Sequence, residues 1–243
     1  MQIEKAKQHY LHTNGFEETH LKAVLFDMDG VLFDSMPIHA SSWSAVMTQF
    51  GLEMTPEEAY MHEGRTGADT INILTQRHWG RPATAEEIEQ IYATKCQTFN
   101  ENKEAPRMDG AANVLAAVKR NGLYTGVVTG SGQHSLIDRL ERNFPGYFKR
   151  EQMVTSSDVT HGKPDPEPYL KGLAKARVNP WEAIVVENAP LGVQAATKAG
   201  IFTIAVNTGP LPDHVLLDAG ANLLFPSMQA LADAWDEIYS RLK

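Results

Sequence analysis

The 243-residue sequence predicts an α/β fold, with a parallel sheet covered by helices on both faces and a smaller all-helical domain inserted into it. Three observations predict this fold. Short runs of apolar and β-branched residues recur along the chain, helical patterns separate most of them, and one long stretch has helical periodicity only. Strands that alternate with helices are typical of parallel sheets, because a crossover between parallel strands needs a long connection.

Six short runs are predicted as strands from their length and their content of β-branched, aliphatic and aromatic residues. Five of them end at Phe26, Val128, Val186, Val206 and Phe225, and one lies around Val154. Helices of the core are predicted over 110–122, 131–144, 166–178 and 190–200. The first and last of these helices end in glycine, which is typical of helix C-terminal caps.

Two further regions are predicted to be helical. Residues 1–20 form an extra amphipathic helix that carries no chemistry of its own. Residues 37–105 contain helical patterns and no credible strand, so we expect a separate helical domain, inserted into a core made of 21–36 and 106–243. Because α/β proteins bind ligands at the carboxyl ends of their strands, an insertion after the first strand is expected to cover that edge as a lid.

Composition excludes several classes of partner. The net charge of −8 argues against nucleic acids and anionic membranes, which need clustered Lys and Arg. No apolar run approaches the ~20 residues that span a bilayer, and the first 20 residues lack the apolar segment of a signal peptide. The single cysteine, Cys96, cannot form an intrachain disulfide. We therefore expect a soluble, cytoplasmic monomer that acts on a small molecule.

Polar residues follow two of the predicted strands at the point where each ends. Asp27 and Asp29 follow the first strand, and two crowded carboxylates are costly unless they meet a cation or share a proton. Thr129, Gly130 and Ser131 follow the second, where a hydroxyl and backbone N–H groups beside a helix start can hold phosphate oxygens. Parallel strands bring these groups to one edge of the sheet.

Two later segments add to this edge. Lys163 lies in a proline-rich loop, and Glu187 and Asn188 follow another predicted strand. Each fragment alone has a plain alternative, such as a turn, a helix cap or a solvated surface charge. Their occurrence in this order, mostly at strand ends, predicts a centre for phosphoryl transfer.

The motifs DMDGV, VVTGS, GKPDPEPY and VVENAPLG resemble, in order, those of the haloacid dehalogenase (HAD) superfamily of phosphotransferases, over about 21–226. The resemblance implies a Rossmann-like three-layer core, a helical cap after the first motif, a Mg²⁺ cofactor and an aspartyl-phosphate intermediate. By the same resemblance, Asp27 is the nucleophile and Asp29 the general acid and base. Thr129 and Lys163 would bind the phosphoryl oxygens.

The same resemblance implies a metal site. Mg²⁺ would be held by Asp27, the backbone carbonyl of Asp29 and Asn188, and Glu187 would orient a metal-bound water. These are hard oxygen ligands, and a cation among them would reduce the repulsion between an anionic nucleophile and a phosphate.

The segment FDMDGVLFDSMPIHASSW resembles the β-phosphoglucomutase branch of the superfamily. His39 falls where mutases have a histidine at the entry to the cap; it either couples cap closure to proton transfer or is an ordinary helix histidine. Two departures weaken a mutase assignment. Residues 66–70 lack the arginine of the mutase cap signature Lys-Gly-x-x-Arg, although Arg65 is nearby, and Asn188 stands where the mutase pattern has Asp.

The cap segment MHEGRTG contains Glu63, an acid that a sugar-phosphate site would hardly favour. Our hypothesis is that Glu63 reaches the metal on closure and restores the charge missing at Asn188; the alternative places it on the cap surface. EGRTG and ENAPLG together resemble a branch that includes an inorganic pyrophosphatase. We therefore expect hydrolysis of a small phosphate, with pyrophosphate favoured, and keep a β-phosphoglucomutase, which interconverts β-glucose 1-phosphate and glucose 6-phosphate, as the alternative. An inactive binding protein is disfavoured because Asp27 and Asp29 are both present.

Overall fold

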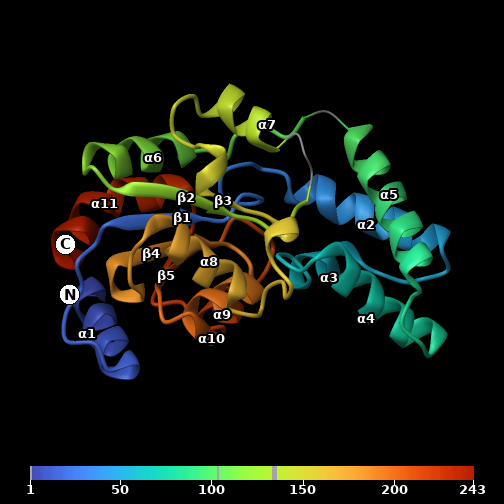
Figure 1. Ribbon diagram of the computed structural model, residues 1–243, viewed down its shortest axis with the longest axis horizontal. Coiled ribbons are helices and arrows are strands. Elements are labelled where there is room, and N and C mark those ends of the chain that lie inside the picture. Colours follow the sequence, from blue (N-terminus) through green and yellow to red (C-terminus); the bar gives the residue numbers. More distant parts are fainter. Residues whose placement is uncertain (1, 103, 133–135) are drawn as a thin grey trace.

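The computed structural model describes residues 2–102, 104–132 and 136–243. Its centre is a six-stranded sheet in the order β3-β2-β1-β4-β5-β6, and all five neighbouring pairs are parallel (Figure 1). The strands are β1 (Ala23–Phe26), β2 (Tyr124–Val128), β3 (Met153–Val154), β4 (Ala183–Glu187), β5 (Phe202–Val206) and β6 (Leu223–Phe225). All six predicted strands are confirmed.

The register of β1 decides what meets at the edge of the sheet. Phe26, its last residue, lies opposite Val127 of β2 and Val186 of β4. Continuing both registers by one residue brings Asp27 level with the ends of the two neighbouring strands. The order of the strands reverses between β1 and β4, which is where α/β sheets of this kind open a crevice for ligands.

Helices cover both faces of the sheet, because successive side chains of a strand point to opposite sides. Val24 and Phe26 belong to a core shared with α6, α7 and α11, whereas Ala23 and Leu25 belong to one shared with α8 and α9. The helices of the core are α6 (Ala111–Arg120), α7 (Leu136–Asn143), α8 (Glu167–Ala176), α9 (Pro190–Lys198), α10 (Asp213–Asp218) and α11 (Met228–Leu242). Short 3-10 turns lie at η1 (Arg150–Gln152), η2 (Ser156–Asp158) and η3 (Pro180–Glu182).

The predicted helical insertion is present between β1 and α6. Its helices are α2 (Met36–Gln49), α3 (Pro56–Met61), α4 (Gly67–Trp79) and α5 (Ala85–Asn100), and they pack around an apolar core of their own. Thr55, Thr66 and Thr84 begin three of them, each accepting a backbone N–H from the residue three positions on. The insertion lies beyond the carboxyl ends of the strands (Figure 1). The proposed limits of 37 and 105 stay a prediction.

The helices differ from the sequence-based expectation in two respects. The terminal helix α1 (Gln2–Asn14) is shorter than 1–20, and it packs on the core through Tyr10, whose hydroxyl donates to the Gly200 carbonyl over 2.8 Å. Helices α10 and α11 were not predicted. Part of the helix expected over 131–144 falls at 133–135, outside the described residues.

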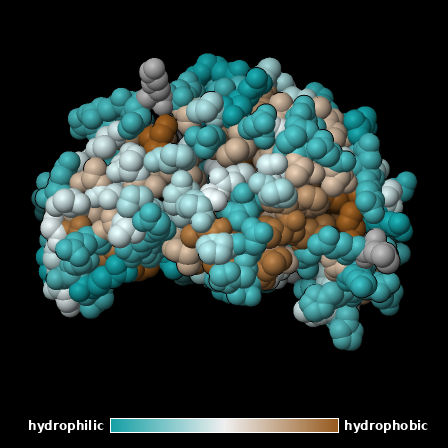
Figure 2. Space-filling model, turned by 180° about the vertical axis from the view of Figure 1, so that it is seen from behind, coloured by the Kyte–Doolittle hydropathy of each residue, from teal (hydrophilic) through white to brown (hydrophobic). Residues whose placement is uncertain are grey.

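In the view of Figure 2, most hydrophobic side chains lie in small groups among polar ones, and the largest group lies on the right of the view. Among the described residues, no helix is both long and apolar enough to cross a membrane. The expected monomer and cytoplasmic location stay predictions.

Candidate active site

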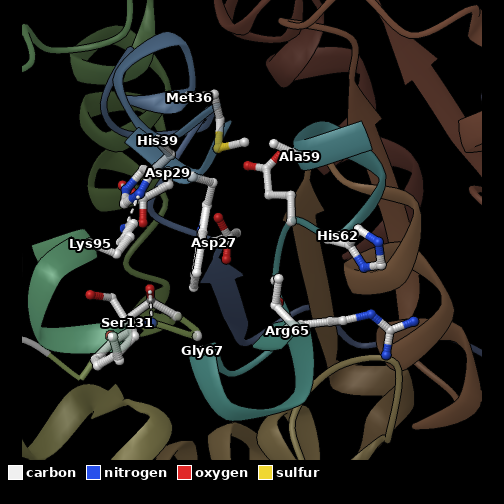
Figure 3. A pocket seen from close by; sticks show the side chains of 17 residues that line it. Asp27, Asp29, Met36, His39, Ala59, His62, Arg65, Gly67, Lys95 and Ser131 are labelled. Carbon is white, nitrogen blue, oxygen red and sulfur yellow. Dashed lines mark hydrogen bonds and ion pairs between the residues drawn. The ribbon is translucent and has the colours of Figure 1, made fainter. Parts of the chain in front are cut away.

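A cavity of about 80 Å³ lies between the carboxyl ends of β1 and β2 and the helical insertion, and a space of that size holds several water molecules (Figure 3). Eight of the predicted site residues line it: Asp27, Asp29, His39, Glu63, Arg65, Thr129, Gly130 and Ser131. The other three, Lys163, Glu187 and Asn188, are buried beside it and bond to one another or to lining residues. The fold thus brings together residues that the sequence separates by more than 150 positions.

Asp27 is held at the first position beyond β1, where its backbone N–H donates to the Val186 carbonyl over 3.0 Å. Its side chain is buried, and Oδ1 accepts a hydrogen bond from Lys163 Nζ over 2.5 Å. Burial raises the pKa of the Asp27 carboxyl above its ordinary value, and the Lys163 ammonium opposes that rise. A cation near Asp27 would favour its charged form further.

Lys163 lies between two carboxylates. Besides Asp27, its Nζ donates to Glu187 Oε1 over 2.6 Å and to the Val128 carbonyl over 3.1 Å. Burial alone would lower the pKa of Lys163, but Asp27 and Glu187 together raise it. Lys163 therefore remains a charged ammonium at the base of the site.

Glu187 is fixed by four hydrogen bonds. Besides Lys163, the Tyr169 hydroxyl donates to Oε1 over 2.8 Å, and the backbone N–H groups of Asn188 and Ala189 donate to Oε2 over 2.9 and 3.1 Å. A Cβ atom on Gly192 of α9 would lie 1.7 Å from Oε1, so only glycine leaves room for this carboxylate. These contacts favour Glu187 as an anchor for Lys163, and they occupy the lone pairs that a metal-bound water would need.

Asn188 and Glu63 meet across the boundary between core and insertion. Asn188 Nδ2 donates to Glu63 Oε1 over 2.9 Å. Glu63 is only 9% exposed, so it does not lie on the cap surface. Burial, and then the neighbouring Asp27, raise the pKa of Glu63 well above its ordinary value. A buried carboxyl facing other acids is costly unless a cation or a proton is present.

The donor set fits a hard cation. Asn188 Oδ1 is buried and has no hydrogen-bond partner in the described part of the chain, which is unusual for a buried polar atom. It lies in the same small region as the carboxylates of Asp27 and Glu63. Gly30, at φ +79°, leaves space for the Asn188 side-chain amide, because a Cβ on Gly30 would lie 2.0 Å from Asn188 Nδ2. Carboxylate and amide oxygens of this kind suit Mg²⁺.

Asp29 has a different environment from Asp27. Its Oδ1 accepts from Ser35 Oγ over 2.5 Å and lies 3.3 Å from His39 Nε2. Burial opposes its ionisation, but His39, Ser35 and Arg139 hold the pKa of Asp29 below its ordinary value. Asp29 is thus an ionised carboxylate facing the cavity, although its low pKa makes it a weak base.

His39 connects Asp29 to a lysine that the sequence analysis did not single out. His39 Nδ1 lies 2.7 Å from Lys95 Nζ, and its ring stacks on Phe99 with centroids 4.2 Å apart. Lys95 is 4% exposed, and burial lowers its pKa to about 8. A signal was present, since Lys95 follows the buried Ile91 by four residues and so interrupts the apolar stripe of α5.

The loop after β2 faces the insertion at close range. Thr129 Oγ1 accepts the backbone N–H of Ser131 over 3.1 Å, and both residues line the cavity. A Cβ on Gly130 would lie 2.8 Å from the Gly64 carbonyl. Arg65 also lines the cavity, but its guanidinium extends away from Asp27, on the side of His62 (Figure 3). The substrate contact expected for Arg65 stays a prediction.

A parallel sheet of this order, with an inserted helical cover and carboxylates at the central strand end, defines an α/β enzyme of the phosphatase or phosphotransferase class. The family model for haloacid dehalogenase-like hydrolases matches residues 24–206, and the chain belongs to this family. It is a HAD-type enzyme of the β-phosphoglucomutase-like branch. The similarity to a pyrophosphatase stays a prediction.

Several known proteins are similar to the chain. A solved structure from Bacteroides vulgatus, provisionally described as a β-phosphoglucomutase, is 58% identical with a TM-score of 0.97, covering 100% of this chain and 98% of that one. A phosphorylated carbohydrates phosphatase from Thermotoga maritima is 32% identical over 83% of this chain and 92% of its own. Hexitol phosphatase A from Escherichia coli is 33% identical over 76% of this chain and 83% of its own.

Proposed function

We propose that this protein is a Mg²⁺-dependent phosphohydrolase that acts through an aspartyl-phosphate on Asp27, with inorganic pyrophosphate as its substrate. The observation that carries the proposal is the contact between Glu63 and Asn188. It brings a carboxylate of the insertion to the oxygen donors at the strand ends. An extra acid at this place disfavours a second, separately bound sugar phosphate and favours a substrate that arrives with a cation.

Asp27, Glu63, Asn188 and the backbone carbonyl of Asp29 are the groups that would hold Mg²⁺. Asn188 Oδ1, which has no hydrogen-bond partner among the residues that the structure describes, and the raised pKa of Glu63 both support a cation there. When bound, Mg²⁺ would reduce the charge repulsion between the Asp27 carboxylate and the anionic phosphate.

In the proposed reaction, an Asp27 carboxylate oxygen attacks one phosphorus atom of pyrophosphate and the bridging P–O bond breaks, which releases phosphate. Lys163 holds Asp27 in place and balances its charge. Asp29 then takes a proton from water as that water attacks the phosphorus of the phosphorylated Asp27, and the second phosphate leaves. Thr129 lines the same cavity, where its hydroxyl can bind phosphoryl oxygens.

The ionised state of Asp29 favours pyrophosphate over a sugar phosphate. A phosphate is a much better leaving group than a sugar alkoxide, so its departure depends less on a proton from the enzyme. Asp29, with its pKa held low, is poorly suited to supply that proton, whereas its ionised form is the one that can accept a proton from water. The small cavity also supports a compact substrate.

Action on a sugar phosphate is the second candidate, and the relatives favour it. The Thermotoga maritima and Escherichia coli relatives are described as phosphatases of phosphorylated carbohydrates and hexitols, and the Bacteroides vulgatus structure as a mutase. A mutase would return the phosphoryl group to a bound glucose phosphate instead of to water. The guanidinium of Arg65, directed away from Asp27, gives that reading little support in this arrangement.

Steady-state kinetics with Mg²⁺ tests the proposal. Pyrophosphate, β-glucose 1-phosphate, hexitol phosphates and phosphoglycolate are compared by kcat/KM, which reports differential binding of the transition state. We expect pyrophosphate to rank first and to yield two phosphates per molecule. A higher value for a sugar phosphate, or conversion of β-glucose 1-phosphate without phosphate release, would overturn it.

A further inference from the structure

The insertion touches the core at a glycine that belongs to neither the metal site nor the phosphate site. Gly162 lies in the loop before Lys163, and it faces Thr66 at the start of α4. A Cβ atom on Gly162 would lie 2.7 Å from Thr66 Cγ2 and 3.2 Å from the Thr66 backbone nitrogen. The two surfaces therefore meet with no room for a methyl group.

Thr66 cannot easily turn away from Gly162. Its Oγ1 accepts the backbone N–H of Asp69 over 3.1 Å and donates to Asp69 Oδ2 over 2.7 Å, as the N-cap of α4. Rotating the side chain would break both hydrogen bonds and remove the N-cap of α4. The Cγ2 methyl is thus fixed against the core loop.

This contact lies next to both halves of the site. Thr66 follows Glu63 by three residues, and Gly162 directly precedes Lys163. Between them, Gly64 covers the lysine stem, because a Cβ on Gly64 would lie 2.9 Å from Lys163 Cδ. The Gly162–Thr66 contact therefore lies one residue from Lys163 on the core side and three residues from Glu63 on the insertion side.

We propose that the contact between Gly162 and Thr66 determines which size of substrate the site prefers, because it fixes how closely the insertion approaches the core over the cavity. With glycine at 162, the segment 63–66 reaches the core and Glu63 meets Asn188. A methyl group at 162 holds this segment away. A displacement of about 1 Å at a catalytic site can lower a rate about 100-fold, so a compact substrate suffers most. The choice of pyrophosphate as the compact substrate rests on the proposed function. The role of the Gly162–Thr66 contact in closure does not depend on that function.

The test uses Gly162→Ala, Thr66→Ser and the double variant. Thr66→Ser keeps the capping hydroxyl but removes Cγ2, the atom that the new methyl would meet. We expect Gly162→Ala to lower kcat/KM for pyrophosphate at least ~10-fold and that for the bulkier p-nitrophenyl phosphate less than ~3-fold. Thr66→Ser alone should stay within ~2-fold of wild type, and the double variant should regain most of the pyrophosphate activity.

A second measurement follows closure without activity. In a Cys96→Ser background, spin labels on Glu89→Cys in α5 and Ala116→Cys in α6 report the distance between insertion and core; both replaced residues are exposed. We expect Gly162→Ala to lengthen this distance and Thr66→Ser to restore it. If Gly162→Ala leaves both the distance and the substrate ratio unchanged, or if Thr66→Ser fails to rescue it, the proposal is overturned. If the label distance changes as expected but the protein does not hydrolyse pyrophosphate, the proposed function is refuted and the proposal about closure stands.

Discussion

Asn188 at the end of β4 donates a hydrogen bond to Glu63 in the helical insertion, over 2.9 Å. The two residues lie 125 positions apart, so the contact depends on the insertion being closed over the sheet. It joins a polar side chain of the core to a buried acid of the insertion.

Glu63→Gln is expected to lower kcat/KM for pyrophosphate at least ~10-fold, because it removes one charge from the groups that would hold Mg²⁺ while keeping their shape. The amide oxygen can still accept from Asn188, so the fold should persist. Activity assays over a range of Mg²⁺ concentrations check this, and wild-type kinetics in the variant would contradict a metal role for Glu63.

Asp27→Asn should abolish phosphate release, with at least a ~10³-fold loss, because an amide is a poor nucleophile towards phosphorus. Asp29→Asn is the matched control. It keeps Asp27 but weakens water activation, so a phosphorylated protein should accumulate after brief exposure to pyrophosphate. Intact-protein mass spectrometry detects that species, and its appearance in Asp27→Asn would rule out Asp27 as its site.

Lys95→Met should stabilise the protein while it disturbs the site. Burial lowers the pKa of Lys95 from 10.5 to about 8, which corresponds to a cost of about 3 kcal/mol when the lysine is protonated in both states. The unfolded chain binds the proton more tightly, so stability of the wild type rises as pH increases from about 8 to 10.5. The gain from Lys95→Met should be full below pH 8 and shrink through that window. Denaturant unfolding at several pH values measures it, and a gain that does not vary with pH would contradict the assignment.

Tyr169→Phe removes the hydroxyl that donates to Glu187 Oε1 over 2.8 Å. Loss of one donor to a buried carboxylate should reduce the free energy of unfolding by about 1–3 kcal/mol. Because Glu187 in turn holds Lys163, kcat should also fall, with KM changed less. Chemical denaturation and steady-state kinetics test the two effects, and unchanged values of both would remove Tyr169 from the network.

The sequence predicts the core of this protein well because its information there is local. Five of the six strands are short apolar runs followed by a polar residue, and the register of a parallel sheet then aligns those residues at one edge. Asp27, Thr129 and Asn188 could accordingly be assigned to one edge before any coordinates were known. The helices of the insertion were equally visible from their helical periodicity, and threonine caps begin three of the four.

What the sequence did not reveal depends on contacts between distant elements. Lysine is usually exposed, and Lys95 is buried because it packs against Trp43 and Phe99. The direction of Arg65 is a matter of side-chain rotamer, which no spacing rule predicts. Helix α11 is a different kind of omission, since Leu231, Trp235, Ile238 and Leu242 follow helical periodicity plainly.

The position of Lys163 has a practical consequence for chemical modification. Its side chain is 1% exposed, its amine bonds to two carboxylates, and Gly64 of the insertion covers its stem. An acylating reagent reacts with neutral, accessible amines, so it should modify exposed lysines such as Lys119 long before this one. Peptide mapping after timed acylation would then give the rate at which Lys163 is modified, and this rate reports how often the insertion opens.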